Sequence, residues 1–230
     1  MLKKSDNLKM YDKGLFFVSL GGIGEIGANC YLYCCDGKWI MIDLGLSFAD
    51  EKYPGIDLLV PKINFLENIK NKLEAIIISH GHEDHAGAVA YLAEKIDCPV
   101  YASSFPKLLI ENRLKEFGKL DSIDLIELDS NKNLSLQNFN LKFINTNHSI
   151  PQPQAIVIET KYGNLLHTAD WKIDNQPTLG KAFNKKNFID LGNDGLLALI
   201  GDSTNADVPG FSSSEEEVKN ELKQVFSRYI

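Results

Sequence analysis

The run HGHEDH, His80-Gly81-His82-Glu83-Asp84-His85, directly follows residues 75–79 (AIIIS), a short apolar run that is typical of a buried strand. Four of its six side chains can bind a metal ion, and it contains three of the five histidines of the chain. His80 and His82 are two residues apart on an extended loop, so both imidazoles can point at one ion. Asp84 and His85 begin the next predicted helix and point elsewhere, which predicts two adjacent metal sites. A mixed set of imidazoles and carboxylates suits Zn²⁺ or Mn²⁺ better than a structural cysteine site does.

Two more candidate ligands lie further along the chain. His148 follows a predicted strand at residues 141–145, and Asp170 follows another at residues 165–168. Side chains just beyond strand ends converge on sites that a rigid sheet holds in place. An aspartate can offer one oxygen to each of two ions, and two ions about 3.5 to 4 Å apart can activate water and stabilise a displacement at phosphorus. His167 lies inside the second strand and is interpreted as structural.

The composition is that of a globular protein. The 230 residues are 44% hydrophobic and 24% charged, and no apolar run approaches the roughly 18 residues that span a bilayer. Residues 1–11 are polar and lack the apolar segment of a signal peptide, so we expect a cytoplasmic protein without membrane contact. The four cysteines form no C-x-x-C pair and are interpreted as reduced thiols. A net charge of −7 argues against a general nucleic-acid binder.

Strands lead along the chain and helices are interspersed, which predicts an α/β fold with much of its sheet antiparallel. Asp36-Gly37 between two strand-forming runs is a strong hairpin signal. Two helices are predicted at residues 86–96 and 105–117. Ser214-Glu215-Glu216-Glu217 forms a capping box, and an apolar helix face then follows. Predicted strands cover residues 15–20, 30–35, 38–43, 75–79, 100–102, 123–128, 141–145, 155–159, 165–168 and 196–200.

Residues 22–27, GIGEIG, match the G-x-G-x-x-G pattern of dinucleotide-binding proteins, and Asp43 lies about 20 residues further on, as that pattern requires. The pattern also needs a helix that begins at the third glycine, so that its N-terminal amides meet a pyrophosphate. Residues 28–33 instead lead into a hairpin rich in strand formers. We therefore interpret this segment as a tight glycine turn that joins two strands near the site.

The ligand pattern resembles that of the metallo-β-lactamase superfamily. Its H-x-H-x-D-H signature corresponds to residues 80–85, and Asp43, His148 and Asp170 match its first, third and fourth motifs. Within that superfamily, further segments resemble the ribonuclease J family of the β-CASP group. These segments are residues 21–27, 54–57, 147–151, 167–172 and 202–206.

This resemblance implies an αββα sandwich that is incomplete in this chain. It divides the chain into an N-terminal extension (1–14), the N-terminal part of the metallo-β-lactamase domain (15–212) and a helix (213–230) that leads into a missing β-CASP domain. The family's later motifs, including a further histidine ligand, would lie beyond residue 230. The chain alone is therefore expected to be an incomplete enzyme.

The resemblance also implies a site and an activity. His80, His82 and His148 would hold one divalent ion, Asp84 and His85 the other, and Asp170 would bridge them. Asp84 and Asp170 would be catalytic, while Asp43 and Asp202 would orient the ligands without binding an ion. The ions would be Zn²⁺, with Mn²⁺ or Mg²⁺ as alternatives. The expected activity is metal-dependent hydrolysis of RNA, as 5′-to-3′ exonuclease and endonuclease, in RNA decay and rRNA processing.

The complete protein would be a homo-oligomer with RNA as its substrate. Lys172, Lys181, Lys185 and Lys186 are the candidate RNA contacts in this part of the chain. Two alternatives stay open. One is a hydrolase of the same fold that acts on a small ester or thiolester, and the other is an inactive, truncated metal-binding remnant.

Overall fold

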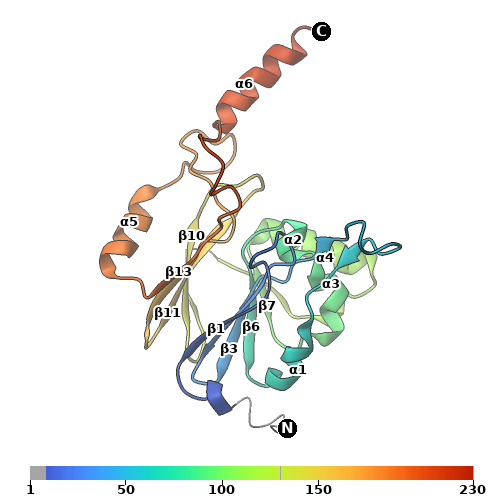
Figure 1. Ribbon diagram of the computed structural model, residues 1–230, viewed down its shortest axis with the longest axis vertical. Helices are drawn as coiled ribbons and strands as arrows, with labels where there is room; N and C mark the ends of the chain where they lie inside the picture. Colours follow the sequence, from blue (N-terminus) through green and yellow to red (C-terminus); the bar gives the residue numbers. More distant parts are fainter. Residues whose placement is uncertain (1–8, 130, 230) are drawn as a thin grey trace.

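The computed structural model describes residues 9–129 and 131–229. Two β-sheets pack face to face with helices on their outer faces (Figure 1). The first sheet has the strand order β1 (Leu15–Gly21), β2 (Cys30–Cys35), β3 (Lys38–Ile42), β6 (Leu73–Ile78), β7 (Val100–Ala102) and β8 (Leu125–Glu127). The second has the order β13 (Ala198–Ile200), β12 (Gly163–His167), β11 (Gln154–Thr160), β10 (Asn140–Asn145) and β9 (Leu134–Ser135). A small hairpin of β4 (Ser47–Phe48) and β5 (Leu58–Leu59) stands apart.

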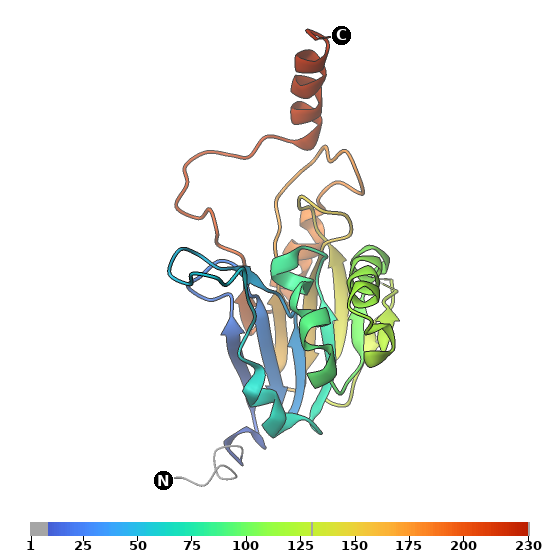
Figure 2. The same ribbon diagram turned by 90° about the vertical axis from the view of Figure 1, so that its right-hand side faces the viewer.

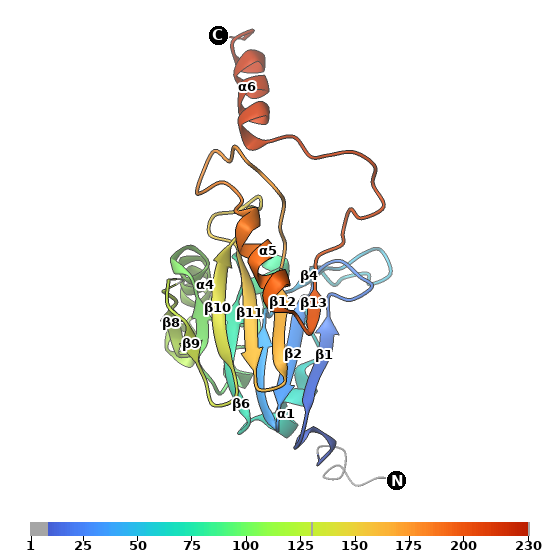
Figure 3. The ribbon, with the colours of Figure 1, turned by 90° about the vertical axis from the view of Figure 1, so that its left-hand side faces the viewer.

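The helices form the outer layers. α1 (Leu66–Ile69), α2 (Glu83–Ala86), α3 (Ala88–Leu92) and α4 (Ser104–Glu116) cover the first sheet (Figure 2). α5 (Lys185–Asp194) lies on the second sheet (Figure 3). α6 (Glu215–Phe226) projects away from the sandwich (Figure 2). Short 3-10 turns occur at η1 (Lys9–Tyr11), η2 (Ile63–Phe65), η3 (Ala93–Lys95) and η4 (Leu120–Ser122).

The alternation of side chains along each strand produces these layers. Along β11, Ile156 and Ile158 face the first sheet, while Val157 between them belongs to a separate core with Phe188 and Leu191 of α5. On the first sheet, Ile77 faces the second sheet, whereas its neighbours face the helices. Each sheet therefore buries both faces, and the predicted αββα arrangement is confirmed.

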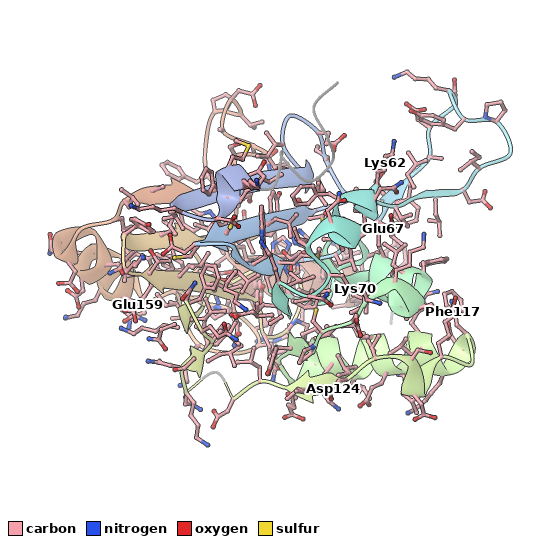
Figure 4. All side chains as sticks on the ribbon, turned by 90° about the horizontal axis from the view of Figure 1, so that it is seen from below. Lys62, Glu67, Lys70, Phe117, Asp124 and Glu159 are labelled. Carbon is pink, nitrogen blue, oxygen red and sulfur yellow. The ribbon has the colours of Figure 1, made fainter. Side chains whose placement is uncertain are left out.

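Charged side chains lie on the outside of this sandwich. Figure 4 shows Lys62, Glu67 and Lys70 on the helical side, with the side chains of the core packed between the layers. Lys70 forms an exposed ion pair with Asp97 at 3.2 Å. Among the described residues, none of the helices combines the length and apolar character that crossing a membrane requires.

The strand directions bring the candidate residues to one edge of the sandwich. β3, β6, β7 and β8 are parallel, and β12 is parallel to β13. β10 and β12 both run antiparallel to β11, which lies between them, so they share a direction. The loops that follow β6, β10 and β12 contain the HGHEDH run, His148 and Asp170 respectively.

The hairpin prediction is confirmed, because Asp36 and Gly37 both have positive φ angles (46° and 76°), as a two-residue type I′ turn requires. The helix predicted at residues 86–96 is instead broken into α2, α3 and η3. At the junction of α2 and α3, a neighbouring segment replaces one helical hydrogen bond. The Ala88 N–H donates to the Leu44 carbonyl, and the Asp84 carbonyl, its helical partner, accepts from the Asn29 N–H instead.

The sequence patterns did not predict α1, α5, β4, β5 or β9. α5 is mostly polar outside its contact with the sheet, although its N-cap residue Asn184, which accepts a hydrogen bond from the Lys186 N–H, was a usable signal. The three strands have two residues each, too short for a periodic pattern. The capping box of α6 is confirmed, and its apolar residues Val218, Leu222, Val225 and Phe226 are exposed.

Candidate metal centre

The HGHEDH loop is held in place by close backbone contacts. It leaves the buried end of β6, and α2 begins at Glu83. Gly45 lies so near that a Cβ on it would come within 1.6 Å of the Asp84 carbonyl oxygen and 2.6 Å of the His85 nitrogen. Only glycine permits this approach, which fixes where the side chains of α2 point.

His80, His82, His148 and Asp170 form a first group of donors. His82 Nδ1 lies 3.2 Å from His80 Nε2 and 3.1 Å from His148 Nε2. His148 Nε2 lies 3.3 Å from Asp170 Oδ2. Ligands about 2.0 to 2.1 Å from a tetrahedral zinc ion lie about 3.3 to 3.4 Å from each other. The separations in the structure come close to those edges, so this group fits a four-coordinate ion.

Asp84, His85 and Asp170 form a second group. His85 Nε2 lies 3.2 Å from Asp170 Oδ1 and 3.6 Å from Asp84 Oδ2. Asp170 thus turns one carboxylate oxygen toward each group. This is the arrangement expected of an aspartate between two neighbouring ions.

The charge states of the candidate ligands suit metal binding. Burial, together with the neighbouring His85, lowers the pKa of His80 to about 2, and burial and His148 lower the pKa of His82. Both imidazoles are therefore neutral at pH 7, as ligation requires. Burial alone would raise the pKa of Asp170, but hydrogen bonds to His148 and His85 hold it well below its ordinary value. Asp170 therefore stays ionised between the two groups.

His85 behaves differently in the absence of an ion. Burial lowers its pKa, but the Asp43 carboxylate and hydrogen bonds to Asp170 and Asp43 outweigh burial and raise the pKa to about 10. In the metal-free protein, an imidazolium therefore lies between two carboxylates. An ion that binds at His85 Nε2 must displace this proton.

Asp43 lies directly behind His85. It is fully buried, has a φ of 62°, and accepts hydrogen bonds from the Ser79 N–H (2.7 Å), the Ser79 hydroxyl (2.8 Å) and His85 Nδ1 (2.7 Å). The contact with Asp43 keeps a proton on His85 Nδ1, so Nε2 is the ring nitrogen that would bind an ion. The structure thus brings Asp43 to the position predicted for it, and the orienting role stays a prediction.

Asp202 is placed differently. Its Oδ1 accepts hydrogen bonds from the N–H (2.9 Å) and hydroxyl (2.7 Å) of Thr204 in its own turn, and its backbone N–H donates to Thr168 Oγ1 (3.1 Å). With Asp84, His85 and Asp170 it lines a cavity of about 400 Å³. The structure therefore brings Asp202 near the second donor group without placing it against a ligand.

A larger cavity of about 1120 Å³ lies on the other side of the cluster, at His148. Lys172 and Lys181, two of the predicted RNA contacts, line it together with Phe105 and Ile150. Lys172 is paired with Asp174 at 3.1 Å and with Glu215 at 3.0 Å, so its charge is largely compensated. Lys185 and Lys186 lie on α5 instead, and Lys186 pairs with Asp190.

Three residues around the cluster were missed by the sequence patterns: Asn29, Tyr31 and Ser79. The Ser79 hydroxyl lies 3.0 Å from His80 Nδ1 and donates to Asp43. It therefore links His80 of the first group to the carboxylate that contacts His85 of the second group. Its position next to His80 was the one available signal. Asn29 contacts Asp84 and His85 across 55 and 56 residues of sequence, a separation at which no local motif could reveal it.

His167 belongs to the core between the sheets, in keeping with its structural interpretation. It is buried, and its Nδ1 lies 2.8 Å from the hydroxyl of Tyr33 on the opposite sheet. Burial lowers the pKa of His167 to about 4, so the ring is neutral. The pair joins β12 to β2 beneath the metal centre.

Tyr33→Phe should therefore lower the free energy of unfolding by about 1 to 2 kcal/mol, because it leaves a buried imidazole nitrogen without a partner. Urea unfolding measures this change. Tyr162→Phe is the matched control, since it removes a hydroxyl that is hydrogen-bonded to Asp36 at the surface. Equal effects of the two variants would contradict the structural importance of the buried pair.

The comparisons with known proteins agree with this geometry. The model of the metallo-beta-lactamase superfamily matches residues 23–204. The chain therefore belongs to the metallo-beta-lactamase superfamily. Among solved structures, a protein of unknown function from Enterococcus faecalis V583 has a TM-score of 0.67 at 18% identity, covering 92% of this chain and 57% of that protein. PqqB from Methylobacterium extorquens, solved with bound Zn²⁺, has a TM-score of 0.50 at 12% identity, covering 74% and 58%.

Within the superfamily, the chain is similar along nearly its whole length to ribonuclease J. It is 40% identical over 220 residues to ribonuclease J of Sinorhizobium meliloti, covering 94% of this chain and 39% of that protein. It is 34% identical to ribonuclease J 1 of Streptococcus pyogenes (95% and 39%) and 33% identical to ribonuclease J 2 of Staphylococcus aureus (96% and 40%). The chain thus spans about two fifths of the length of the curated relatives it matches.

Proposed function

We propose that this chain carries the two-ion centre of a ribonuclease that hydrolyses phosphodiester bonds in RNA as a 5′-to-3′ exonuclease and endonuclease. The observation that carries the proposal is the position of Asp170, which turns one carboxylate oxygen toward each of two donor groups. The choice of RNA rests on the similarity to ribonuclease J.

The donor chemistry favours Zn²⁺, with Mn²⁺ and Mg²⁺ as alternatives, because three imidazoles meet in the first group. Two such ions, when bound, activate water and stabilise the charge that develops on phosphate oxygens. The side chains hold this chemistry in place. Asp170 orients His148 and His85, and we assign Asp84, at the wall of the smaller cavity, the acceptance of a proton from the attacking water.

The acidic character of the chain is compatible with an RNA substrate. Two divalent ions would change the net charge from −7 to about −3, and they would sit where the acidic ligands are concentrated. The cavity at His148, whose lining combines Lys181 with apolar side chains such as Phe105 and Ile150, is large enough for a nucleotide. We further propose, from the resemblance to ribonuclease J, that the complete protein is a cytoplasmic homo-oligomer.

Removal of metal tests the proposal. The full-length gene product, stripped with a chelator, should leave a 5′-monophosphorylated RNA uncut, and Zn²⁺ or Mn²⁺ should restore cleavage. A DNA of the same sequence and a small thiolester serve as comparison substrates. Cleavage that persists after chelation would contradict the two-ion proposal. Faster hydrolysis of the thiolester would favour a small-ester hydrolase, and a metal-loaded protein without activity would favour a remnant.

A further inference from the structure

The glycine turn after β1 leads to Asn29, a buried side chain that contacts the second donor group. Asn29 Nδ2 donates to the Asp84 carbonyl oxygen at 3.0 Å and lies 3.3 Å from Asp84 Oδ2. It also lies 3.0 Å from His85 Nε2. One amide thus touches the two residues that belong to the second group alone.

Asp84 and Tyr31 together orient this amide. The Asp84 oxygens are acceptors, so the NH₂ group of Asn29 must face them. The Tyr31 hydroxyl donates to Asn29 Oδ1 at 2.7 Å and also lies 3.2 Å from the Gly22 carbonyl oxygen. Tyr31 thereby satisfies the amide oxygen on the side away from Asp84 and supports this orientation.

Gly22 leaves room for the hydrogen-bonded pair of Asn29 and Tyr31. A Cβ on Gly22 would come within 2.3 Å of both Asn29 Oδ1 and the Tyr31 hydroxyl oxygen. Gly24, in the same turn, offers a direct comparison. Its φ of 73° is close to the 82° of Gly22, but a Cβ on it would meet no described atom within 4 Å. Both glycines adopt a positive φ, but of the two only Gly22 lies against Asn29 and Tyr31.

We propose that Asn29 is a positioning residue that orients Asp84 for the second ion, and that Tyr31 and Gly22 keep it in place. This inference rests on the proposed two-ion function and deepens it, since it gives the glycine turn a role at the site. Partners that orient metal ligands typically contribute about 10- to 100-fold to metal affinity. His80, His82 and His148 are not among the hydrogen-bond partners of Asn29. We therefore expect Asn29 to affect the affinity for the second ion and not for the first.

Calorimetric titration of the chelator-stripped, full-length protein with Zn²⁺ tests this. Asp84→Ala first identifies which binding step belongs to the second group. Asn29→Ala should weaken that step about 10- to 100-fold and leave the other unchanged. Tyr31→Phe should act in the same direction with a smaller effect. Gly22→Ala should also weaken the second step, whereas Gly24→Ala, the matched control, should not.

A double variant separates positioning from general damage. If Asn29 acts through Asp84, then Asn29→Ala should have no further effect on Zn²⁺ affinity in the Asp84→Ala background. Wild-type affinities in Asn29→Ala, or equal weakening of both steps, would overturn the inference while two ions still bind. Equal effects of Gly22→Ala and Gly24→Ala would also overturn it. A wild-type protein that binds fewer than two ions would overturn the two-ion function itself and this inference with it.

Discussion

Asp170→Ala is expected to reduce metal-dependent RNA cleavage by about 10³-fold or more. Asp170 Oδ1 lies beside His85 and Oδ2 beside His148, so the substitution removes a ligand from both groups at once. Metal-ion stabilisation of a phosphoryl transition state is worth several kcal/mol, and about 4 kcal/mol corresponds to a factor of about 10³ in rate. The rate of cleavage of an end-labelled RNA under single-turnover conditions measures the loss.

Two further variants make this result interpretable. Asp84→Ala removes a ligand from the second group alone and should reduce the rate less than Asp170→Ala does. Glu67→Ala removes an exposed carboxylate of α1 that belongs to neither group, and it should leave the rate nearly unchanged. The bridging position of Asp170 would be refuted if Asp170→Ala still bound two ions with wild-type affinity.

The candidate ligands that the structure brings together could be found from the sequence because they combine distinctive residue types with recognisable positions. The run at residues 80–85 contains its ligands within six residues, and the strand before it could be identified from its apolar character. His148 and Asp170 are further away, but both follow predicted strands. Strand ends converge in any sandwich whose strands share a direction, so the sequence could place these side chains without coordinates.

The supporting residues could not be found in the same way. Asn29 is a common residue type, and its role depends on a contact with Asp84 that spans 55 residues of sequence. Lys172 shows a second kind of information that the sequence lacks. Lys172 was a candidate RNA contact, but tertiary packing gives it Asp174 and Glu215 as partners. The immediate neighbours of a surface or loop residue decide what it does, and these neighbours come from distant segments.

Helix boundaries near the site failed for a related reason. The apolar spacing of residues 86–96 predicts one continuous helix, since periodicity reflects only which faces are buried. The Ala88 N–H instead donates to the Leu44 carbonyl, and the Asp84 carbonyl accepts from the Asn29 N–H. This competition shortens α2 to one turn and, with Gly45 against its backbone, fixes the orientation of Asp84 and His85.

Asp43→Asn tests whether Asp43 fixes the tautomer of His85 in the second group. The Ser79 N–H donates to Asp43 Oδ1, so an asparagine should keep its amide oxygen there and place its NH₂ where Oδ2 was. That NH₂ would then face His85 Nδ1, which donates to the Asp43 carboxylate in the native protein. His85 would have to present a lone pair at Nδ1 and carry its proton on Nε2, the atom that faces Asp84 and Asp170.

The expected result is a folded protein with a defective second site. Affinity for the second ion should fall about 10- to 100-fold, and RNA cleavage should fall by up to about 10⁴-fold, the loss that a wrong histidine tautomer causes in a catalytic triad. Ser79→Ala, which keeps the Asp43 carboxylate and removes only one hydroxyl donor, should have a smaller effect on both measurements. Nitrogen-15 NMR of the histidines reports directly which ring nitrogen of His85 carries the proton.

Two outcomes would contradict the tautomer argument. His85 could keep its proton on Nδ1 in Asp43→Asn, or the Zn²⁺ affinity could stay unchanged. In either case Asp43 would act through its charge or through packing rather than by fixing the tautomer.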